Sequence, residues 1–259
     1  MPLFNRGHIV GEAIESVLGQ TFTDWELVIV NDGSTDNSLE VAQDYARKDM
    51  RIRVLDQPNG GSVAARNNGI AVAVGEYIFP LDDDDKISPE ALSELFAAAK
   101  SGLGDVVYSE TVRFGAEQGL LELPLPTPEN IPYRNCVVCS ALYRKSDWEK
   151  YGGYDVNMKD GYEDWEFWLN FVAQGKTFYR IPKPLFYYRI ASKSRNVTIQ
   201  KSSKRAKARL KKYLRKKHSM LYELPKVKLT WSSRLYLLFV KLFNSRYTYR
   251  KIRQQLSKC

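Results

Sequence analysis

The fold is indicated by the stretch Glu26-Leu-Val-Ile-Val-Asn31, which runs directly into Asp32-Gly-Ser-Thr-Asp-Asn37. The first segment is short, apolar and partly β-branched, which is typical of a buried strand. The second segment predicts a turn, and the residues after it predict a helix from about 38 to 48. Before the strand, apolar residues at spacings of three and four predict another helix: Ile9, Ala13, Ile14, Val17 and Leu18.

Strands and helices continue to alternate along the chain. We expect strands at 51–56, 75–82 and 105–109, an apolar run at 136–143 and a helix at 163–174. Ser62 is expected to cap a helix that reaches Val74, and Ser88 is expected to cap the helix after the aspartate-rich segment. This alternation predicts an α/β fold with a mostly parallel sheet flanked by helices.

The composition is that of a globular protein, since 44% of the 259 residues are apolar and 27% are charged. No apolar stretch reaches the roughly eighteen residues that a membrane-spanning helix needs. The first residues lack the pattern of a secretory signal. Cys136, Cys139 and Cys259 are too few and too irregularly spaced for a disulfide framework. We therefore expect a cytoplasmic protein.

Charge divides the chain into two parts. Residues 1–190 carry 18 Lys and Arg against 29 Asp and Glu, whereas residues 191–259 carry 21 Lys and Arg and a single acidic residue, Glu223. The division predicts an acidic body over 1–190 and a basic helical tail over 191–259, with different roles. The body is suited to hold a cation, and the tail is suited to meet an anionic surface.

Acidic residues follow two of the predicted strands. Asp32 ends the strand at 26–31, and Asp82–Asp85 follow the strand at 75–82. Ligands of open α/β sheets bind outside the carboxyl ends of the strands, so both loops are candidates for one site. Four adjacent carboxylates repel each other and require a cation or solvent, and oxygen ligands suit Mg²⁺ or Mn²⁺. The alternative is a solvated acidic turn before a helix.

Two other segments have both a structural and a functional interpretation. Glu163 and Asp164 begin a helix, where they either stabilise its N-terminus or supply a general base beside a cleft. The loop at 59–62, with Arg66 after it, either begins an ordinary helix or presents backbone N–H groups to a phosphate. Cys136 and Cys139 are expected in apolar packing, because the chain has only two histidines to complete a zinc site.

In their order along the chain, these segments resemble the family 2 glycosyltransferases, which have the GT-A fold. The resemblance covers about residues 2–190. It implies a Rossmann-like, mostly parallel sheet flanked by helices, followed here by a basic helical C-terminal extension. The segments that carry it are Pro2-Leu-Phe-Asn5, 12–22, Trp25–Asp36, Asn59–Gly69, Gly75–Asp85 and Gly152–Trp165.

The resemblance implies a role for each matching residue on the donor side. Asp32 would contact the base of a nucleotide sugar, and Pro2, Phe4 and Asn5 would line the same pocket. Gly61 and Arg66 would belong to the same donor site. The segment Asp82, Asp83 and Asp84 matches the DxD-type motif of the family, and Asp84 would be the direct ligand of Mn²⁺ or Mg²⁺.

On the acceptor side, Asp164 matches the catalytic base of the family, with Glu163 and Trp165 beside it. The resemblance thus predicts an inverting, metal-dependent glycosyltransferase with a nucleotide-sugar donor, most simply a UDP-sugar, and a saccharide or lipid-linked acceptor. Synthesis of a surface polysaccharide is the expected setting. The chemistry agrees, because a diphosphate leaving group needs a cation and an acceptor hydroxyl needs a base.

Two positions depart from the pattern of the family. Pro2–Asn5 reads as the end of a strand whose body is absent, and Asn31 stands where the family often has a second Asp. The first departure motivates an alternative, a truncated member that binds a nucleotide sugar or a membrane without turnover.

The basic tail has alternatives of its own. Residues 201–217 hold ten Lys and Arg and no acid. Apolar residues then recur at helical spacing as far as Leu242. A basic amphipathic helix over 201–243 predicts peripheral contact with an anionic membrane, at the inner face of the cell membrane. The alternatives are a helix that packs on the acidic body, or a nucleic-acid-binding tail, which no recognised module supports.

Overall fold

The computed structural model describes residues 1–158, 161–190 and 204–223. The apolar segment at 26–31 forms strand β2 (Leu27–Asp32), which lies between β1 (Pro2–Leu3) and β3 (Ile52–Gln57) in a parallel sheet. Strand β1 pairs Pro2 with Val30 and Leu3 with Asn31 of β2. The Met1 ammonium continues that edge by donating a hydrogen bond to the Val28 carbonyl at 2.7 Å.

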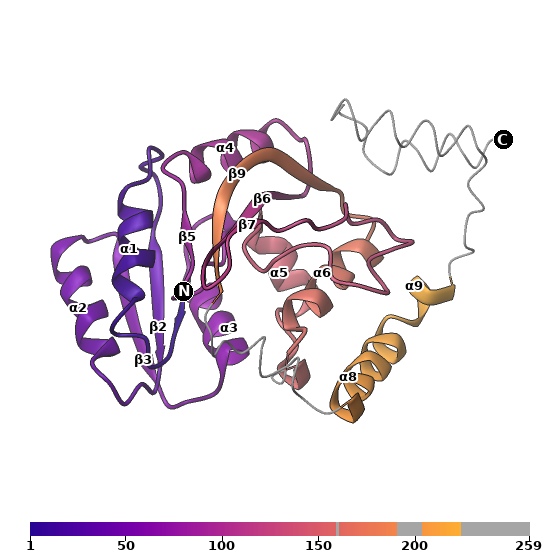
Figure 1. Cartoon of the computed structure of the whole chain (residues 1–259), viewed down its shortest axis with the longest axis horizontal. Helices are drawn as coiled ribbons and strands as arrows, with labels where there is room; N and C mark the ends of the chain where they lie inside the picture. Colours follow the sequence, from indigo (N-terminus) through magenta and orange to yellow (C-terminus); the bar gives the residue numbers. More distant parts are fainter. Residues whose placement is uncertain (159–160, 191–203, 224–259) are drawn as a thin grey trace.

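The side chains of β2 alternate between the two faces of this sheet, as the period of a strand requires. Leu27 and Ile29 face the core formed with helices α1 (Val10–Leu18) and α2 (Ser38–Lys48), whereas Val28 and Val30 pack with Ala65 of helix α3 (Ser62–Val72). Helices α1 and α2 therefore cover one face of the sheet and α3 covers the other (Figure 1). The predicted helices at 9–18, 38–48 and 62–74 are confirmed within two residues.

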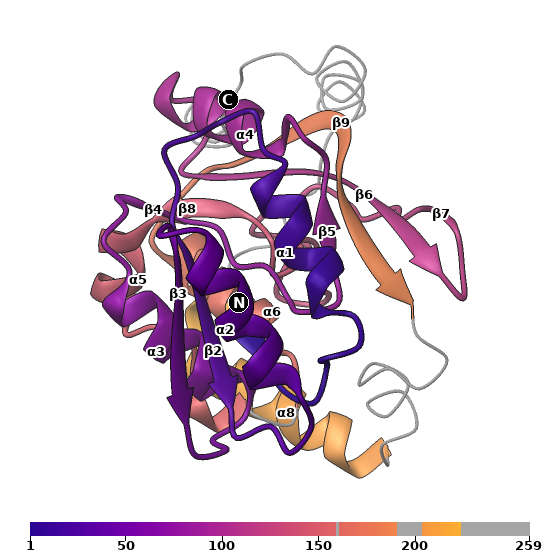
Figure 2. The same ribbon diagram turned by 90° about the vertical axis from the view of Figure 1, so that its left-hand side faces the viewer.

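The remaining strands form a second, mixed sheet in the order β4-β8-β6-β9-β5, and β7 pairs with β6. The long strands β6 and β9 run parallel, while the short strands pair antiparallel with their neighbours. Figure 2 shows β6 and β9 side by side. The strands are β4 (Tyr77–Ile78), β5 (Lys86–Ile87), β6 (Val106–Gly115), β7 (Gly119–Leu120), β8 (Leu142–Arg144) and β9 (Phe178–Ile190).

Helix α6 (Glu163–Ala173) is the centre of the second core. Its predicted apolar face is confirmed, because Trp165, Trp168, Leu169 and Val172 are all buried. Tyr143 of β8 contacts the rings of Phe167, Trp168 and Phe171 edge-on, so the helix and the sheet share one aromatic cluster. The other helices of this half are α4 (Ala91–Lys100), α5 (Lys145–Tyr151) and the 3₁₀ turn η1 (Val156–Met158).

Part of the basic tail belongs to the same core. Helix α8 (Lys204–Lys217) and the short α9 (Ser219–Glu223) bury Leu210, Leu214 and Leu221 in the cluster that contains Trp165 and Trp168. The outer face of α8 carries exposed basic side chains, which are Lys211, Lys212, Arg215 and Lys216. This stretch of the tail is a helix packed on the acidic body, which was the alternative interpretation of the sequence.

Several local predictions are wrong. Ser88 does not cap α4, which begins at Ala91. The Ser88 N–H donates a hydrogen bond to the Leu185 carbonyl, and the Ser88 carbonyl accepts from Gln20 and from the Ala91 N–H. The buried Ser88 hydroxyl has no hydrogen-bond partner among the described residues. Ser62 is the first residue of α3 rather than its cap, and Gly61 precedes it with a φ of 85°. The run at 136–143 is mainly loop, because β8 begins only at Leu142. Strand β9 was not predicted at all.

A cavity of about 430 Å³ is lined by residues of both sheets beside the start of β1, although the sheets share one apolar core elsewhere. Met1, Leu27 and Val28 line it from the first sheet, and Tyr77 and Ile78 line it from β4. The described strands of the two sheets are therefore joined by side-chain packing rather than by backbone hydrogen bonds.

Candidate active site

The loop after β3 is fastened to the end of β2 by Asp32. Its carboxylate accepts hydrogen bonds from the backbone N–H groups of Gly60 and Gly61, both at 2.8 Å, and from the Gln57 amide at 2.7 Å. Gly33 has a φ of 70°, and a Cβ atom there would lie 2.8 Å from the Asn59 nitrogen. The glycines at 33 and 60–61 let the two loops approach within hydrogen-bond distance.

The segment after β1 lies beside the same loops. The backbone of Asn5 has a φ of 52°, and its N–H donates a hydrogen bond to the Ser34 hydroxyl. The side-chain oxygen of Asn5 accepts a hydrogen bond from the Thr35 N–H at 2.8 Å. The Phe4 ring is 45% exposed, and the Phe4 N–H donates to a carboxylate oxygen of Asp83 at 3.1 Å. Of the predicted donor-side residues, Phe4 thus contacts the aspartate-rich loop through Asp83, and Asn5 contacts the loop that follows Asp32.

The four aspartates of that loop occupy different environments. Asp82 pairs with Arg66 at 2.7 Å, and Asp84 lies 3.6 Å from Arg6. Burial, followed by repulsion from Asp84, raises the pKa of Asp83 to about 7. Burial and the neighbouring carboxylate of Asp82 also raise the pKa of Asp84. Asp85 is fully buried, accepts the Arg189 N–H at 2.8 Å and points away from solvent.

Arg66 connects this loop to the start of helix α6. Its guanidinium is 4% exposed and lies between Asp82, at 2.7 Å, and Glu163, at 3.7 Å. A cation in such a place is stabilised only by the carboxylates around it. Asp82 and Glu163, which are 81 positions apart in the sequence, therefore meet at one side chain.

The neighbouring residue, Asp164, is held by the protein at both carboxylate oxygens. One oxygen accepts a hydrogen bond from Asn135 at 2.8 Å and the other from the Trp165 N–H at 2.7 Å. Burial, followed by repulsion from Glu163, raises the pKa of Asp164 to about 6. A carboxylate with a pKa near 6 is ionised at neutral pH and is a stronger proton acceptor than an ordinary aspartate.

Cys139 lies beside the aspartate-rich loop, although its sequence context suggested only packing. Its thiol lies 3.5 Å from the Asp82 carboxylate. Burial raises the pKa of this thiol well above its ordinary value, and the charges of Asp82, Asp85 and Asp164 add to the shift. The structure thus brings Cys139 into contact with the aspartate-rich loop, within the electrostatic range of Asp164. No local signal in the sequence indicates this, nor the contributions of Arg6, Asn135 and Arg189.

Other predicted residues are placed differently. Trp165 is 3% exposed, and its indole N–H donates to the Ile131 carbonyl at 2.6 Å, so its ring is part of the core and does not line a cleft. Among the described residues, no group of three or more His, Cys, Asp or Glu side chains has an arrangement ready to hold a metal ion. Burial and the neighbouring carboxylates nevertheless raise the pKa values of Asp83 and Asp84, and adjacent oxygen atoms of this kind suit a hard cation.

Comparison with known proteins decides the family. A family model described as glycosyl transferase family 2 matches residues 1–152. The chain belongs to this family. It is 44% identical over 107 residues to the uncharacterized glycosyltransferase EpsJ of Bacillus subtilis, which covers 41% of this chain and 31% of EpsJ. It is 38% identical over 120 residues to the glycosyltransferase GlyG of Streptococcus pneumoniae, which covers 46% of this chain and 40% of GlyG. The matched stretches thus span less than half of these relatives.

Solved structures support the fold of this chain. The S. aureus TarS fragment 1–349, crystallised with UDP-GlcNAc, superimposes with a TM-score of 0.66 at 21% identity, covering 78% of this chain and 60% of that one. The GT-A-type α/β fold predicted from the sequence is therefore confirmed. In the described part of the chain, none of the helices combines the length and the apolar character that crossing a membrane requires.

Proposed function

We propose that this glycosyltransferase transfers a sugar from a UDP-sugar to a saccharide or lipid-linked acceptor, with inversion and with help from a divalent cation. The observation that carries the proposal is the position of Arg66 between Asp82 and Glu163. It supports a single site in which one acidic segment faces a diphosphate and the other faces an incoming hydroxyl.

On the donor side, we assign nucleotide binding to Asp32, with Pro2, Phe4 and Asn5 lining the pocket and Gly61 and Arg66 beside the phosphates. The glycine loop fastened to Asp32 and the exposed Phe4 ring support this assignment, because a base can stack on the ring. The UDP-GlcNAc complex of TarS supports a UDP-sugar donor. The residues that would hold Mn²⁺ or Mg²⁺ are Asp82, Asp83 and Asp84, and the cation would neutralise the diphosphate leaving group.

On the acceptor side, we assign Asp164 as the base that takes the proton of the acceptor hydroxyl, and Glu163 as its neighbour facing the acceptor. The raised pKa of Asp164, about 6, supports this role. The base acts from the face opposite the leaving group, which gives inversion in a single displacement. The chain is also 40% identical over 92 residues to the chondroitin synthase of Pasteurella multocida, which covers 36% of this chain and 10% of that protein. This similarity favours a polysaccharide product.

The division into a catalytic body over 1–190 and a basic tail over 191–259 remains a proposal, as does contact of residues 201–243 with an anionic membrane. The exposed lysines of α8 support the second proposal. Residues 201–203 and 224–243, which include most of the predicted amphipathic stretch, lie outside the described residues.

The proposed function is tested by the variant Asp164→Asn, with the exposed Asp24→Asn as control. The wild-type chain should be stabilised against heat by UDP-sugars with Mn²⁺, because a ligand that binds only the folded state raises its stability. Asp164→Asn should keep this shift and lose about 10²- to 10⁴-fold in transfer rate. A normal rate would remove Asp164 from its role, and donor binding without any transfer by the wild type would favour the non-catalytic alternative.

A further inference from the structure

Helix α6 carries the candidate base on one side of its first turn and a buried carboxylate on the other. Asp164 and Glu166 are two residues apart, which places them about 200° apart around the helix axis. Asp164 is held toward Asn135, whereas Glu166 is fully buried beneath α8. A contact that fixes Glu166 therefore also fixes the rotation of the turn that presents Asp164.

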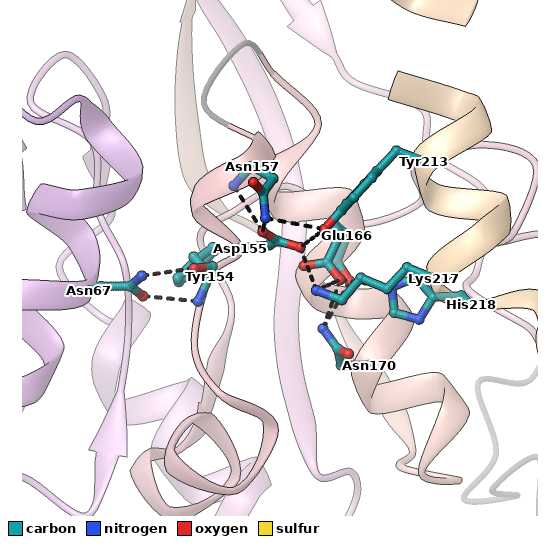
Figure 3. A network of polar contacts seen from close by, with 9 residues as sticks. All are labelled: Asn67, Tyr154, Asp155, Asn157, Glu166, Asn170, Tyr213, Lys217 and His218. Atoms are coloured by element: carbon teal, nitrogen blue, oxygen red, sulfur yellow. Dashed lines mark hydrogen bonds and ion pairs between the residues drawn. The ribbon is translucent and has the colours of Figure 1, made fainter. Parts of the chain in front are cut away.

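Glu166 is bound by two consecutive side chains at the end of α8. One of its carboxylate oxygens lies 2.7 Å from Nε2 of His218 and 2.8 Å from Nζ of Lys217, and Asn170 donates to the same oxygen at 3.2 Å (Figure 3). A buried carboxylate needs such partners to remain charged in an apolar core. The end of α8 thus supplies the groups that neutralise the carboxylate of the base helix.

Lys217 also reaches a second segment that leads to the site. Its ammonium lies 2.6 Å from Asp155, which Tyr213 also contacts at 2.7 Å. Although burial alone would raise the pKa of Asp155, the hydrogen bonds from Lys217, the Asn157 N–H and Tyr213 lower it to about 2. Asp155 is therefore held as an anion against α8 (Figure 3).

This second segment continues to Arg66. Tyr154 precedes Asp155, and its backbone N–H and carbonyl are both bound by the Asn67 side chain, at 2.9 and 2.8 Å. The Arg66 guanidinium lies 5.1 Å from the centre of the Tyr154 ring. The end of α8 thus contacts two segments that lead to the proposed active site. One is the first turn of α6, through Glu166, and the other is Asp155, which follows Tyr154.

We propose that Lys217 and His218 are positioning residues for the reaction: through Glu166 and Asp155 they hold the first turn of α6 and the Tyr154 segment in the arrangement that aims Asp164 into the site. This inference rests on the proposed function. The apolar side of α8, with Leu210 and Leu214 in the core, holds the helix in place independently of these ionic contacts. The contacts with Glu166 and Asp155 thus set the position of the base rather than the docking of the helix.

The test compares Lys217→Met with Lys216→Met in the full chain. The two lysines are adjacent and both are exposed, but it is the Lys217 ammonium that reaches Asp155, at 2.6 Å, and Glu166, at 2.8 Å. A displacement of about 1 Å at a reacting group costs about 10²-fold in rate, so we expect Lys217→Met to lower kcat by about 10- to 10²-fold. The KM for the UDP-sugar should stay within about 2-fold, because the ion pairs of Arg66 with Asp82 and Glu163 hold the proposed donor side when the Tyr154 segment shifts. Lys216→Met should change neither constant.

Further variants separate positioning from general destabilisation. Lys217→Arg keeps the charge and should recover most of kcat. Should Lys217→Met fail to fold, Glu166→Gln, which keeps the size of the side chain, should give the same loss of kcat at constant KM. The inference is overturned if the wild type transfers sugar and Lys217→Met matches Lys216→Met in kcat. A wild type that neither binds UDP-sugars nor transfers sugar would overturn the proposed function itself.

Discussion

The variant Asp83→Asn should stabilise the fold in a way that depends on pH. Asp83 lies in the aspartate-rich loop, and its pKa is raised from the ordinary 3.8 to about 7 by burial and by Asp84. A carboxyl group with a raised pKa binds more protons in the folded than in the unfolded state between these two values. Its ionisation therefore destabilises the fold progressively as pH rises from about 4 to about 7, and the penalty is constant above that.

The magnitude follows from the two pKa values. At about 1.4 kcal/mol per pKa unit, the penalty is about 2 kcal/mol at pH 5.5 and about 4 kcal/mol at pH 8. Asn keeps the size of the side chain and an oxygen for the Phe4 N–H, but it carries no charge. Asp83→Asn should therefore gain about 2 kcal/mol in free energy of unfolding at pH 5.5 and about 4 kcal/mol at pH 8.

Urea unfolding without added metal or nucleotide, at both pH values, measures this gain, and the exposed Asp24→Asn serves as the matched control. The same variant should lose stabilisation by UDP-sugar with Mn²⁺, because a proposed metal ligand is gone. A gain that is equal at the two pH values, or a net destabilisation at pH 8, would refute the reasoning, since the charge on Asp83 would then not be the source of strain.

Two further variants test the packing of the tail and of the donor loops. Leu214→Ala should lower the free energy of unfolding, measured in urea, by about 2–5 kcal/mol, because this side chain of α8 is fully buried. The exposed Lys212→Ala should change the free energy of unfolding little. Equal effects of the two variants would mean that α8 does not pack on the body of the protein. Gly33→Ala should abolish the thermal shift given by UDP with Mn²⁺, because Ala disfavours a φ of 70° and its Cβ would lie 2.8 Å from the Asn59 nitrogen. An unchanged shift would show that the contact of these loops is not needed for binding.

The sequence predicts the elements whose burial is simple. Strand β2 and helix α2 follow the predicted limits closely, because one is buried on both faces and the other has a regular apolar stripe. Strand β9 escaped prediction because its residues combine Lys183 and two prolines with aromatic side chains, a pattern that fits a strand only when β6 lies beside it. The cap at Ser88 was wrong because tertiary contacts with Leu185 and Gln20 take its backbone.

In the candidate site, the sequence does not predict which charged groups surround the aspartates. A run of four aspartates suggests an open cluster of ligands, yet three arginines that are remote in the sequence share it: Arg66 binds Asp82, Arg6 lies near Asp84, and Arg189 donates to Asp85 and to the Asp84 carbonyl. These contacts offset part of the repulsion among the four carboxylates. They also mean that spacing alone cannot identify the metal ligand, because a cation that binds Asp84 must compete with Arg6, whereas Asp83 has only to release a proton.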